Sequence, residues 1–297
     1  MFVEALETVG GYTRPIFTIA RRYNTSDIAP GSATMFFINE EGWALTTRHI
    51  AKMIREASAL DKNYAAFRED RARISPEANY QDEMKLLEIK YNLSEKKAAQ
   101  MKVSFFDCVD KLTGFEVKIS GKYDLAAIHL TGYDNILYQG HAVFSDTPED
   151  ANPGKFLCRV GYPFAEFQNY EYDPEKDEIR WNNKGHRFSS RFPAEAMMTR
   201  LSAGPEGING IELNAQAMLG LNGAPLFDEK GLVYGMQTGS SKSRLTICLH
   251  GAIIREFLEK EHIPYYVSNR RDIMINGPVK RNSIPMGTII KSATNRR

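Results

Sequence analysis

A glycine-rich stretch in the C-terminal half of the chain decides the fold: Ala217-Met-Leu-Gly-Leu-Asn-Gly-Ala-Pro-Leu-Phe227. Gly220 and Gly223 lie on either side of one polar residue, Asn222, and an apolar run follows. Glycine lets a backbone turn sharply, because it adopts conformations that other residues avoid. The stretch therefore predicts a tight turn that presents the Asn222 side chain and its neighbouring amides, followed by a β-strand.

Two β-rich runs near the N-terminus precede a histidine. Ser32-Ala-Thr-Met-Phe-Phe-Ile-Asn39 and Trp43-Ala-Leu-Thr-Thr47 are separated by the short acidic turn Glu40-Glu-Gly42. Runs of this kind joined by a short turn with glycine predict a β-hairpin. We expect the hairpin to place His49, which follows directly, just beyond the end of its second strand.

Three more stretches have the pattern of β-strands. Asp124 starts the apolar run Asp124-Leu-Ala-Ala-Ile128, a position where an aspartate is often only a turn residue. Gly154-Lys-Phe-Leu-Cys-Arg-Val-Gly-Tyr-Pro-Phe164 is a strand followed by a tight turn, and Gly231-Leu-Val-Tyr-Gly-Met-Gln-Thr-Gly239 is a strand with glycines at regular places.

Together these stretches resemble the chymotrypsin-fold serine proteases, particularly the bacterial HtrA-type and related trypsin-like peptidases. Residues 31–49 end in the T-x-H of that family, and residues 217–227 are similar to its G-x-S-G-(G/A)-P loop. The resemblance spans about residues 15–265. It implies an all-β fold of two six-stranded antiparallel β-barrels, with the active-site loops at their interface.

The resemblance also implies a division of the chain. We expect an N-terminal barrel over residues 1–143 and a C-terminal barrel over residues 144–267, closed by an amphipathic helix at Ala252–Lys260. Residues 194–201 fit either a strand or a short helix. Residues 268–297 are rich in Lys and Arg and read as a basic tail, either solvated or binding a partner.

A segment of about residues 50–101 interrupts the strand pattern of the first barrel. Its apolar residues recur at helical spacing, Pro76 separates two helical segments, and Ser94 is a candidate cap for a third. Positive and negative side chains nearly balance, which favours a solvated helical hairpin. A protein partner that docks on this insert is the open alternative.

Residue by residue, the resemblance implies a triad in the order His, Asp, nucleophile. His49 corresponds to the general base, Asp124 to the carboxylate that orients it, and Asn222 occupies the nucleophile position. The backbone N–H groups of Gly220 and Asn222 correspond to the oxyanion hole.

The substrate-binding pocket is implied on either side of the turn, at residues 214–218 and 236–240. Its predicted lining residues are Asn214, Gln216, Met236, Gln237, Thr238 and Gly239. No acidic residue lies where trypsin-like enzymes select Lys or Arg, so a basic side chain before the scissile bond is not indicated.

Asn222 is the departure from the family pattern. A carboxamide nitrogen is conjugated and is a poor nucleophile, so His49 cannot activate it as it activates a serine hydroxyl. The sequence therefore predicts a trypsin-like serine endopeptidase homologue, a hydrolase in ancestry, that is inactive as written, whether Asn222 is natural or engineered. The alternative is a non-enzymatic peptide- or partner-binding module that uses the former cleft and the helical insert.

Composition limits the other partners and the compartment. The net charge is +1, which gives no general electrostatic basis for binding nucleic acid or an anionic membrane. The sequence shows no membrane-spanning run and no signal-peptide pattern. Cys108, Cys158 and Cys248 lack metal-site spacing and read as reduced thiols. We expect a cytoplasmic protein with a peptide or protein ligand and with neither metal nor organic cofactor.

Overall fold

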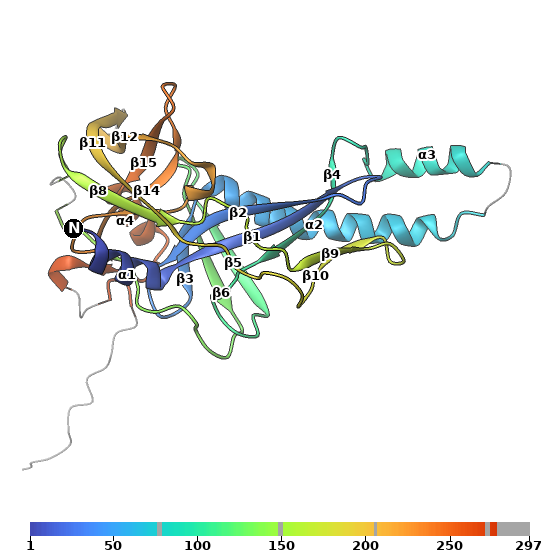
Figure 1. The fold of residues 1–297 in the computed structure, drawn as a ribbon, viewed down its shortest axis with the longest axis horizontal. Helices are drawn as coiled ribbons and strands as arrows, with labels where there is room; N and C mark the ends of the chain where they lie inside the picture. Colours follow the sequence, from blue (N-terminus) through green and yellow to red (C-terminus); the bar gives the residue numbers. More distant parts are fainter. Residues whose placement is uncertain (76–78, 148–150, 205–206, 271–273, 278–297) are drawn as a thin grey trace, which may run out of the picture.

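The computed structural model describes residues 1–75, 79–147, 151–204, 207–270 and 274–277. Most of the regular structure is β, arranged as two sheets with helices at their margins (Figure 1). This confirms the predicted fold class at the level of a mostly-β chain with one barrel and one half-barrel.

The first sheet has six antiparallel strands in the order β4-β1-β2-β3-β6-β5. Its strands are β1 (Thr13–Arg22), β2 (Ile28–Phe37), β3 (Trp43–Thr46), β4 (Ala98–Ser104), β5 (Gly114–Ile119) and β6 (Ala126–Thr131). The predicted hairpin is β2–β3, with Phe36 opposite Leu45. Among the described residues no pairing joins β4 to β5, so this sheet is a half-barrel where a closed barrel was expected.

The second sheet has eight strands in the order β13-β8-β11-β12-β15-β14-β7-β16. They are β7 (Val143–Phe144), β8 (Phe156–Gly161), β11 (Phe192–Gly204), β12 (Gly207–Gln216), β13 (Pro225–Phe227), β14 (Leu232–Ser240), β15 (Leu245–His250) and β16 (Tyr266–Val267). An additional pairing of β13 with β14 closes the run from β13 to β14 into a barrel. Residues 194–201, left open by the sequence, belong to strand β11.

Two helices cover this barrel. α4 (Gly251–Lys260) lies where the closing helix was predicted and buries Ile254, Phe257 and Leu258, the apolar stripe of its sequence. α1 (Val3–Tyr12) was not predicted. The residue before it, Phe2, packs its ring edge-on against Phe227 of β13, with the ring centroids 6.2 Å apart. The N-terminal segment therefore packs on the second barrel before the chain enters the first sheet.

Helices also form in the predicted insert. α2 (Arg48–Arg71) starts one residue after β3 has ended, and α3 (Tyr80–Lys90) runs beside it. β4 begins at Ala98, so the insert ends before residue 101, its predicted limit. Ser94 lies in a non-helical turn, since the chain is already returning to the sheet, and caps no third helix. Pro76 lies outside the described residues.

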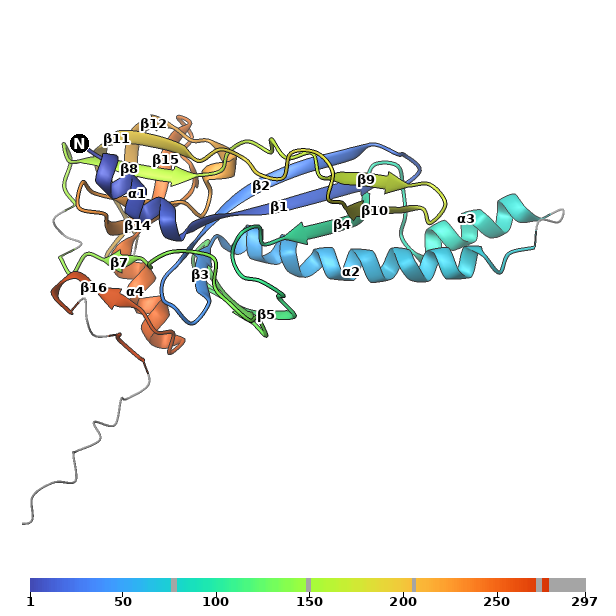
Figure 2. The ribbon, with the colours of Figure 1, turned by 60° about the horizontal axis from the view of Figure 1, so that its bottom comes forward.

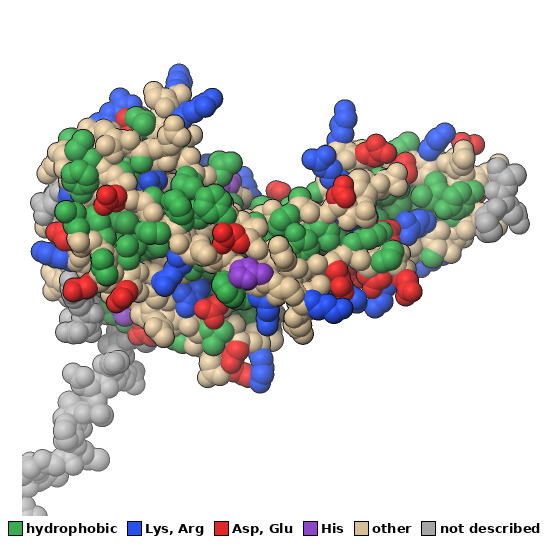
Figure 3. Space-filling model, in the orientation of Figure 1, with side chains coloured by type: hydrophobic (Ala, Val, Ile, Leu, Met, Phe, Trp, Pro, Cys, Tyr) green, Lys and Arg blue, Asp and Glu red, His purple; other side chains and the backbone are tan. Residues whose placement is uncertain are grey.

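The helical insert forms the centre of an elongated part of the molecule, which we call the arm. The arm consists of α2, α3, β4, the distal ends of β1 and β2, and the hairpin β9 (Tyr170–Asp173)–β10 (Glu178–Trp181), and it extends away from the second barrel in both views (Figures 1 and 2). Acidic and basic side chains are both present on the face of the arm seen in Figure 3, in small groups among apolar side chains, in keeping with the balanced composition. α3 has no buried residue and exposes Leu86 and Ile89.

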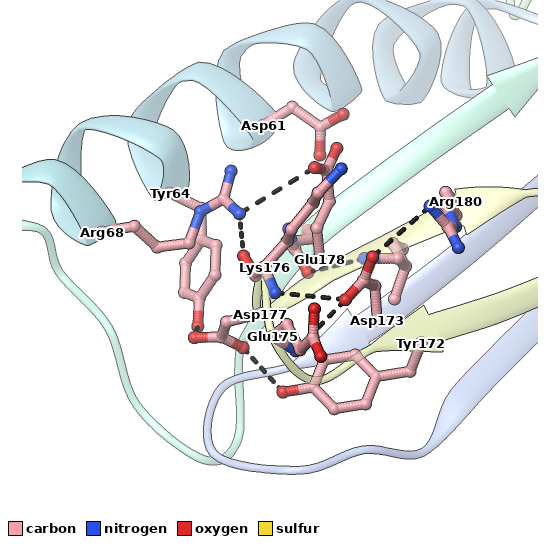
Figure 4. Close-up of polar contacts among 12 residues, drawn as sticks. Asp61, Tyr64, Arg68, Tyr172, Asp173, Glu175, Lys176, Asp177, Glu178 and Arg180 are labelled. Carbon is pink, nitrogen blue, oxygen red and sulfur yellow. Dashed lines mark hydrogen bonds and ion pairs between the residues drawn. The ribbon is translucent and has the colours of Figure 1, made fainter.

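The hairpin is held against α2 by polar contacts. Tyr64 of α2 and Tyr172 of β9 both donate to the carboxylate of Asp177, at 2.8 and 2.9 Å, and Arg68 of α2 donates to the Lys176 carbonyl (Figure 4). The helical insert and a hairpin from the C-terminal half of the chain therefore form one connected structure.

The C-terminal tail and the length of the helices bear on two further sequence predictions. The predicted basic tail, residues 268–297, lies mostly outside the described residues, which include only 268–270 and 274–277 of it. Over the described part of the chain, no helix combines the length and the apolar character that crossing a membrane requires.

Candidate active site

His49 and Asp124 meet at the junction of β3, α2 and β6. His49 lies in the first turn of α2, and Asp124 lies just before β6. His49 Nδ1 is 2.8 Å from Asp124 Oδ2, and the His49 backbone N–H donates to Asp124 Oδ1 at 3.0 Å. The amides of a first helical turn lack partners within the helix, and the Thr47 side chain caps none. One carboxylate thus holds both the imidazole and the start of α2.

The contacts of Asp124 keep it ionised. Burial raises the pKa of this carboxyl, but hydrogen bonds from the His49 ring and amide lower it by more, so it lies below its usual value. An ionised Asp124 favours the His49 tautomer with the proton on Nδ1, which leaves Nε2 as an acceptor. Thr47 Oγ1 lies 3.4 Å from Nε2. With 48% of its side chain exposed, this histidine combines a carboxylate partner at Nδ1 with a ring that is open to solvent.

The turn around Asn222 requires both of its glycines. A Cβ added at Gly220 would lie 2.3 Å from Pro163 Cα, and Gly223 has a φ of +91° with a Cβ position 2.0 Å from the Thr34 carbonyl oxygen. No L side chain fits either position without moving the backbone. The tight turn predicted from these glycines is present.

Within the turn, Asn222 does not present its amide. Residues Leu219–Leu221 form a 3₁₀ turn, and the Asn222 N–H donates to the Leu219 carbonyl at 3.0 Å. An amide that donates within its own turn cannot also donate to a bound oxyanion unless the turn opens. The oxyanion hole of Gly220 and Asn222 therefore stays a prediction that requires a rearranged turn.

The Asn222 side chain is directed into the second barrel. It is 7% exposed, and its Oδ1 accepts a hydrogen bond from Gln237 Nε2 at 3.3 Å. Across the described ranges, no hydrogen bond joins the Asn222 carboxamide to the His49 ring. The structure thus brings His49 and Asp124 together as the sequence predicted, and it ties Asn222 to β14.

The other predicted lining residues have separate surroundings. Asn214 Oδ1 accepts from the Met197 amide, Met236 is fully buried in the core, and the Thr238 hydroxyl donates to the Ile247 carbonyl. Gln216 is exposed, and Gly239 lies in β14. Gln237 has the most connections among the predicted set. Its Nε2 also donates to the Met218 carbonyl at 2.9 Å, so it joins β14 to the turn.

Arg159 was missed by the sequence reasoning. It lies in β8 and is 1% exposed, and its Nη1 donates to Gln237 Oε1 at 2.6 Å and to Thr246 Oγ1 at 2.9 Å. Burial lowers the pKa of this guanidinium. A charged residue inside the otherwise apolar run Phe156–Gly161 was the available signal.

The thiols do not supply a substitute nucleophile. Cys108, Cys158 and Cys248 are buried and unpaired by disulfides. Burial raises the pKa of the Cys158 thiol to about 11 and that of Cys248 to about 12, and it raises the pKa of Cys108 further. Neutral, buried thiols are unreactive. The described residues hold no group of three His, Cys, Asp or Glu that could bind a metal ion.

Comparison with solved structures relates the fold to that of proteases. The HtrA-type protease AlgW with a tripeptide aligns with a TM-score of 0.50 at 13% identity, over 89% of this chain and 64% of that chain. The fold is that of the chymotrypsin-like serine proteases. The active and inactive forms of the Rv3671c protease, the active one from M. tuberculosis, align at 13% identity with TM-scores of 0.47 and 0.45. They cover 86% of this chain and 83% and 92% of theirs. No protein-family model matches the chain, and neither does any curated protein.

Proposed function

We propose that this chain is a serine-endopeptidase homologue that does not hydrolyse peptide bonds appreciably and that binds a peptide segment in the former cleft. The observation that carries the proposal is Asn222 at the nucleophile position, with its side chain held by Gln237 and its amide by the Leu219 carbonyl. Both the attacking atom and one donor for the oxyanion are thus missing from the arrangement.

The chemical reason is the carboxamide itself. In the triad mechanism the imidazole removes a hydroxyl proton while oxygen attacks the scissile carbonyl. The nitrogen of Asn222 has its lone pair conjugated with the carbonyl, so loss of a proton to His49 Nε2 yields no comparable nucleophile. A triad without its nucleophile retains only about 10³–10⁴-fold acceleration over water.

The retained dyad supports a role for the cleft. His49 and Asp124 keep a 2.8 Å contact, and nearly half of the histidine side chain is exposed at the position where a peptide would pass. The HtrA-type protease AlgW, which shares the fold, was solved with a tripeptide. A peptide is therefore the class of ligand that we assign to this cleft.

A peptidase assay tests the absence of hydrolysis. We expect no turnover of fluorogenic casein by the unmodified protein, and none by the matched variant His49→Ala. Turnover by the unmodified protein that is lost in His49→Ala would show that this chain is an active peptidase.

The variant Asn222→Ser tests whether His49 and Asp124 still support hydrolysis when a serine stands at position 222. Since His49 and Asp124 are already in contact, we expect a serine at this position to give casein turnover that disappears in the double variant with His49→Ala. If Asn222→Ser also fails to cleave, the closed turn at Leu219 is part of a dedicated binding site, and the ancestral catalytic arrangement is lost beyond the nucleophile.

A further inference from the structure

We propose, on the basis of the proposed function, that Arg159 makes the cleft select an acidic side chain of the bound peptide. Arg159 is then a specificity-determining residue, and Glu or Asp is the ligand residue that it receives next to the Asn222 turn.

The position of the guanidinium supports this assignment. Two of its neighbours, Gln237 and Thr246, connect it to the segment before the Asn222 turn: Gln237 Nε2 donates to the Met218 carbonyl, and Thr246 Oγ1 donates to the Ala215 carbonyl at 3.0 Å. Residues 214–218 and 236–240 are the two segments that the family resemblance predicts as walls of the substrate pocket. Arg159 therefore contacts one of these predicted walls directly, at Gln237, and is connected to the other through Gln237 and Thr246.

The charge has no counter-ion. Among the described residues no carboxylate lies within ion-pair distance of Arg159, its Nη1 contacts are neutral oxygens, and its Nε has no hydrogen-bond partner. Removing an ion from water is costly unless charge and hydrogen bonds compensate it. A group that is 1% exposed and only partly compensated is a strong site for an incoming carboxylate.

A chain of contacts links this charge to the nucleophile position. Asn222 Oδ1 accepts from Gln237 Nε2, and Gln237 Oε1 in turn accepts from Arg159 Nη1. Gln237 thus occupies, with a neutral amide oxygen, the position that a ligand carboxylate would take. If the Gln237 amide turns aside, a carboxylate can accept from Nη1 in its place, and a charged acceptor forms a stronger hydrogen bond with a guanidinium than a neutral one does.

The chemistry favours an acid over its amide. A guanidinium only donates hydrogen bonds, so the ligand must accept them, and a charged acceptor gains more than a neutral one of the same shape. Glu and Gln differ in little else, which makes them a matched pair of probes.

The test compares peptide pools on the full chain. The probes are fluorescein-labelled heptapeptides blocked at both ends, with Glu or Gln fixed at the centre and only uncharged residues elsewhere, and binding is measured by fluorescence polarisation. We expect the Glu pool to bind at least about tenfold more tightly than the Gln pool, the scale of one charged hydrogen bond.

Two variants assign the preference to Arg159. Arg159→Met removes the charge, and Gln237→Glu supplies an internal carboxylate at the 2.6 Å contact and keeps the arginine in place if the first variant fails to fold. We expect both to abolish the difference between the pools. Arg22→Met, the same substitution at an exposed position of β1, should preserve it.

The outcomes separate this inference from the function on which it rests. Equal binding of the Glu and Gln pools to the unmodified protein would leave peptide binding intact and overturn the acidic preference. A preference that persists in both Arg159→Met and Gln237→Glu would assign it to another residue. If neither pool binds, the proposed peptide binding is wrong, and the inference that rests on it is wrong as well.

Discussion

Two buried arginines of this molecule have opposite surroundings. Arg21 in the arm is 2% exposed, and each of its nitrogens has an acceptor: Nη2 on Asp177 at 2.7 Å, Nε on Gln100 at 2.9 Å and Nη1 on the Thr25 carbonyl at 2.8 Å. Arg159 in the second barrel is 1% exposed and contacts neutral oxygens with one nitrogen.

Two tyrosine rings also lie against the Arg21 guanidinium. The guanidinium carbon lies 5.2 Å from the centre of the Tyr64 ring and 4.8 Å from that of Tyr172. The hydroxyls of both tyrosines donate to Asp177 (Figure 4). Asp177 is also the carboxylate that pairs with Arg21. The charge of Arg21 is compensated by a carboxylate, by neutral acceptors and by two aromatic rings, and these contacts stabilise the arm. The charge of Arg159 is incompletely compensated, and this difference is why we assign structure to one arginine and ligand recognition to the other.

The largest expected effect on the free energy of unfolding comes from removing the counter-ion of Arg21. Asp177→Asn leaves Arg21 buried without its counter-ion, so we expect the free energy of unfolding to fall by about 3–5 kcal/mol in urea titrations. Asp82→Asn, the same change at a carboxylate that is 83% exposed on α3, should leave the urea midpoint unchanged.

The same titration applied to Arg159→Met sharpens the contrast. This change removes a poorly compensated charge but deprives Gln237 Oε1 of its donor, and these effects oppose each other. We expect a net change within about 2 kcal/mol. A loss as large as that of Asp177→Asn would show that Arg159 is structural too and would remove the contrast between the two sites.

The second expected effect is a pH dependence at Asp177. Burial raises the pKa of this carboxyl, but hydrogen bonds from Tyr64 and Tyr172 and the charges of Arg21 and Arg71 lower it by more, to below its ordinary 3.8. Its stabilising contribution is therefore complete well above pH 3.8 and is lost as the pH falls through the folded-state value.

Unfolding free energies measured at several pH values check this sign. The difference between the unmodified protein and Asp177→Asn should be largest near neutral pH and should shrink as the pH is lowered below 3.8. A difference that is constant, or that grows with acid, would mean that Asp177 is not the charged partner of the arm.

The smallest expected effect is the loss of one hydrogen bond. Tyr64→Phe keeps the ring over Arg21 and removes the hydroxyl that donates to Asp177 at 2.8 Å. We expect about 1 kcal/mol of destabilisation by urea titration. Tyr80→Phe on α3, where the ring is 42% exposed, is the matched control and should have no measurable effect. Equal effects of the two variants would show that the hydroxyl of Tyr64 contributes nothing specific.

The sequence predicted the parts of the site that depend on local pattern. The T-x-H after a hairpin and the aspartate before an apolar strand implied the contact between His49 and Asp124 through their resemblance to the family's motifs, and the two side chains are in contact. The glycines around Asn222 foretold a tight turn, because close backbone approach leaves no room for a side chain there.

Other features depend on tertiary packing and could not be foreseen. Whether the Asn222 amide points outward or bonds to Leu219 is a choice between two turn conformations that the same residues allow. The role of Arg159 depends on which face of β8 points into the barrel and on neighbours 78 and 87 residues away in the chain. α1 escaped prediction since its short apolar pattern is stabilised by packing on the second barrel.

The continuity of α2 has a mechanical consequence. One unbroken helix joins His49 in its first turn to Arg71 at its far end, a rod about 36 Å long at 1.5 Å per residue. A rod of this kind cannot roll about its axis at one end while the other end stays still. The imidazole and the far end of the arm therefore belong to one continuous element, so that a rotation of α2 about its axis would be transmitted to the contact between His49 and Asp124.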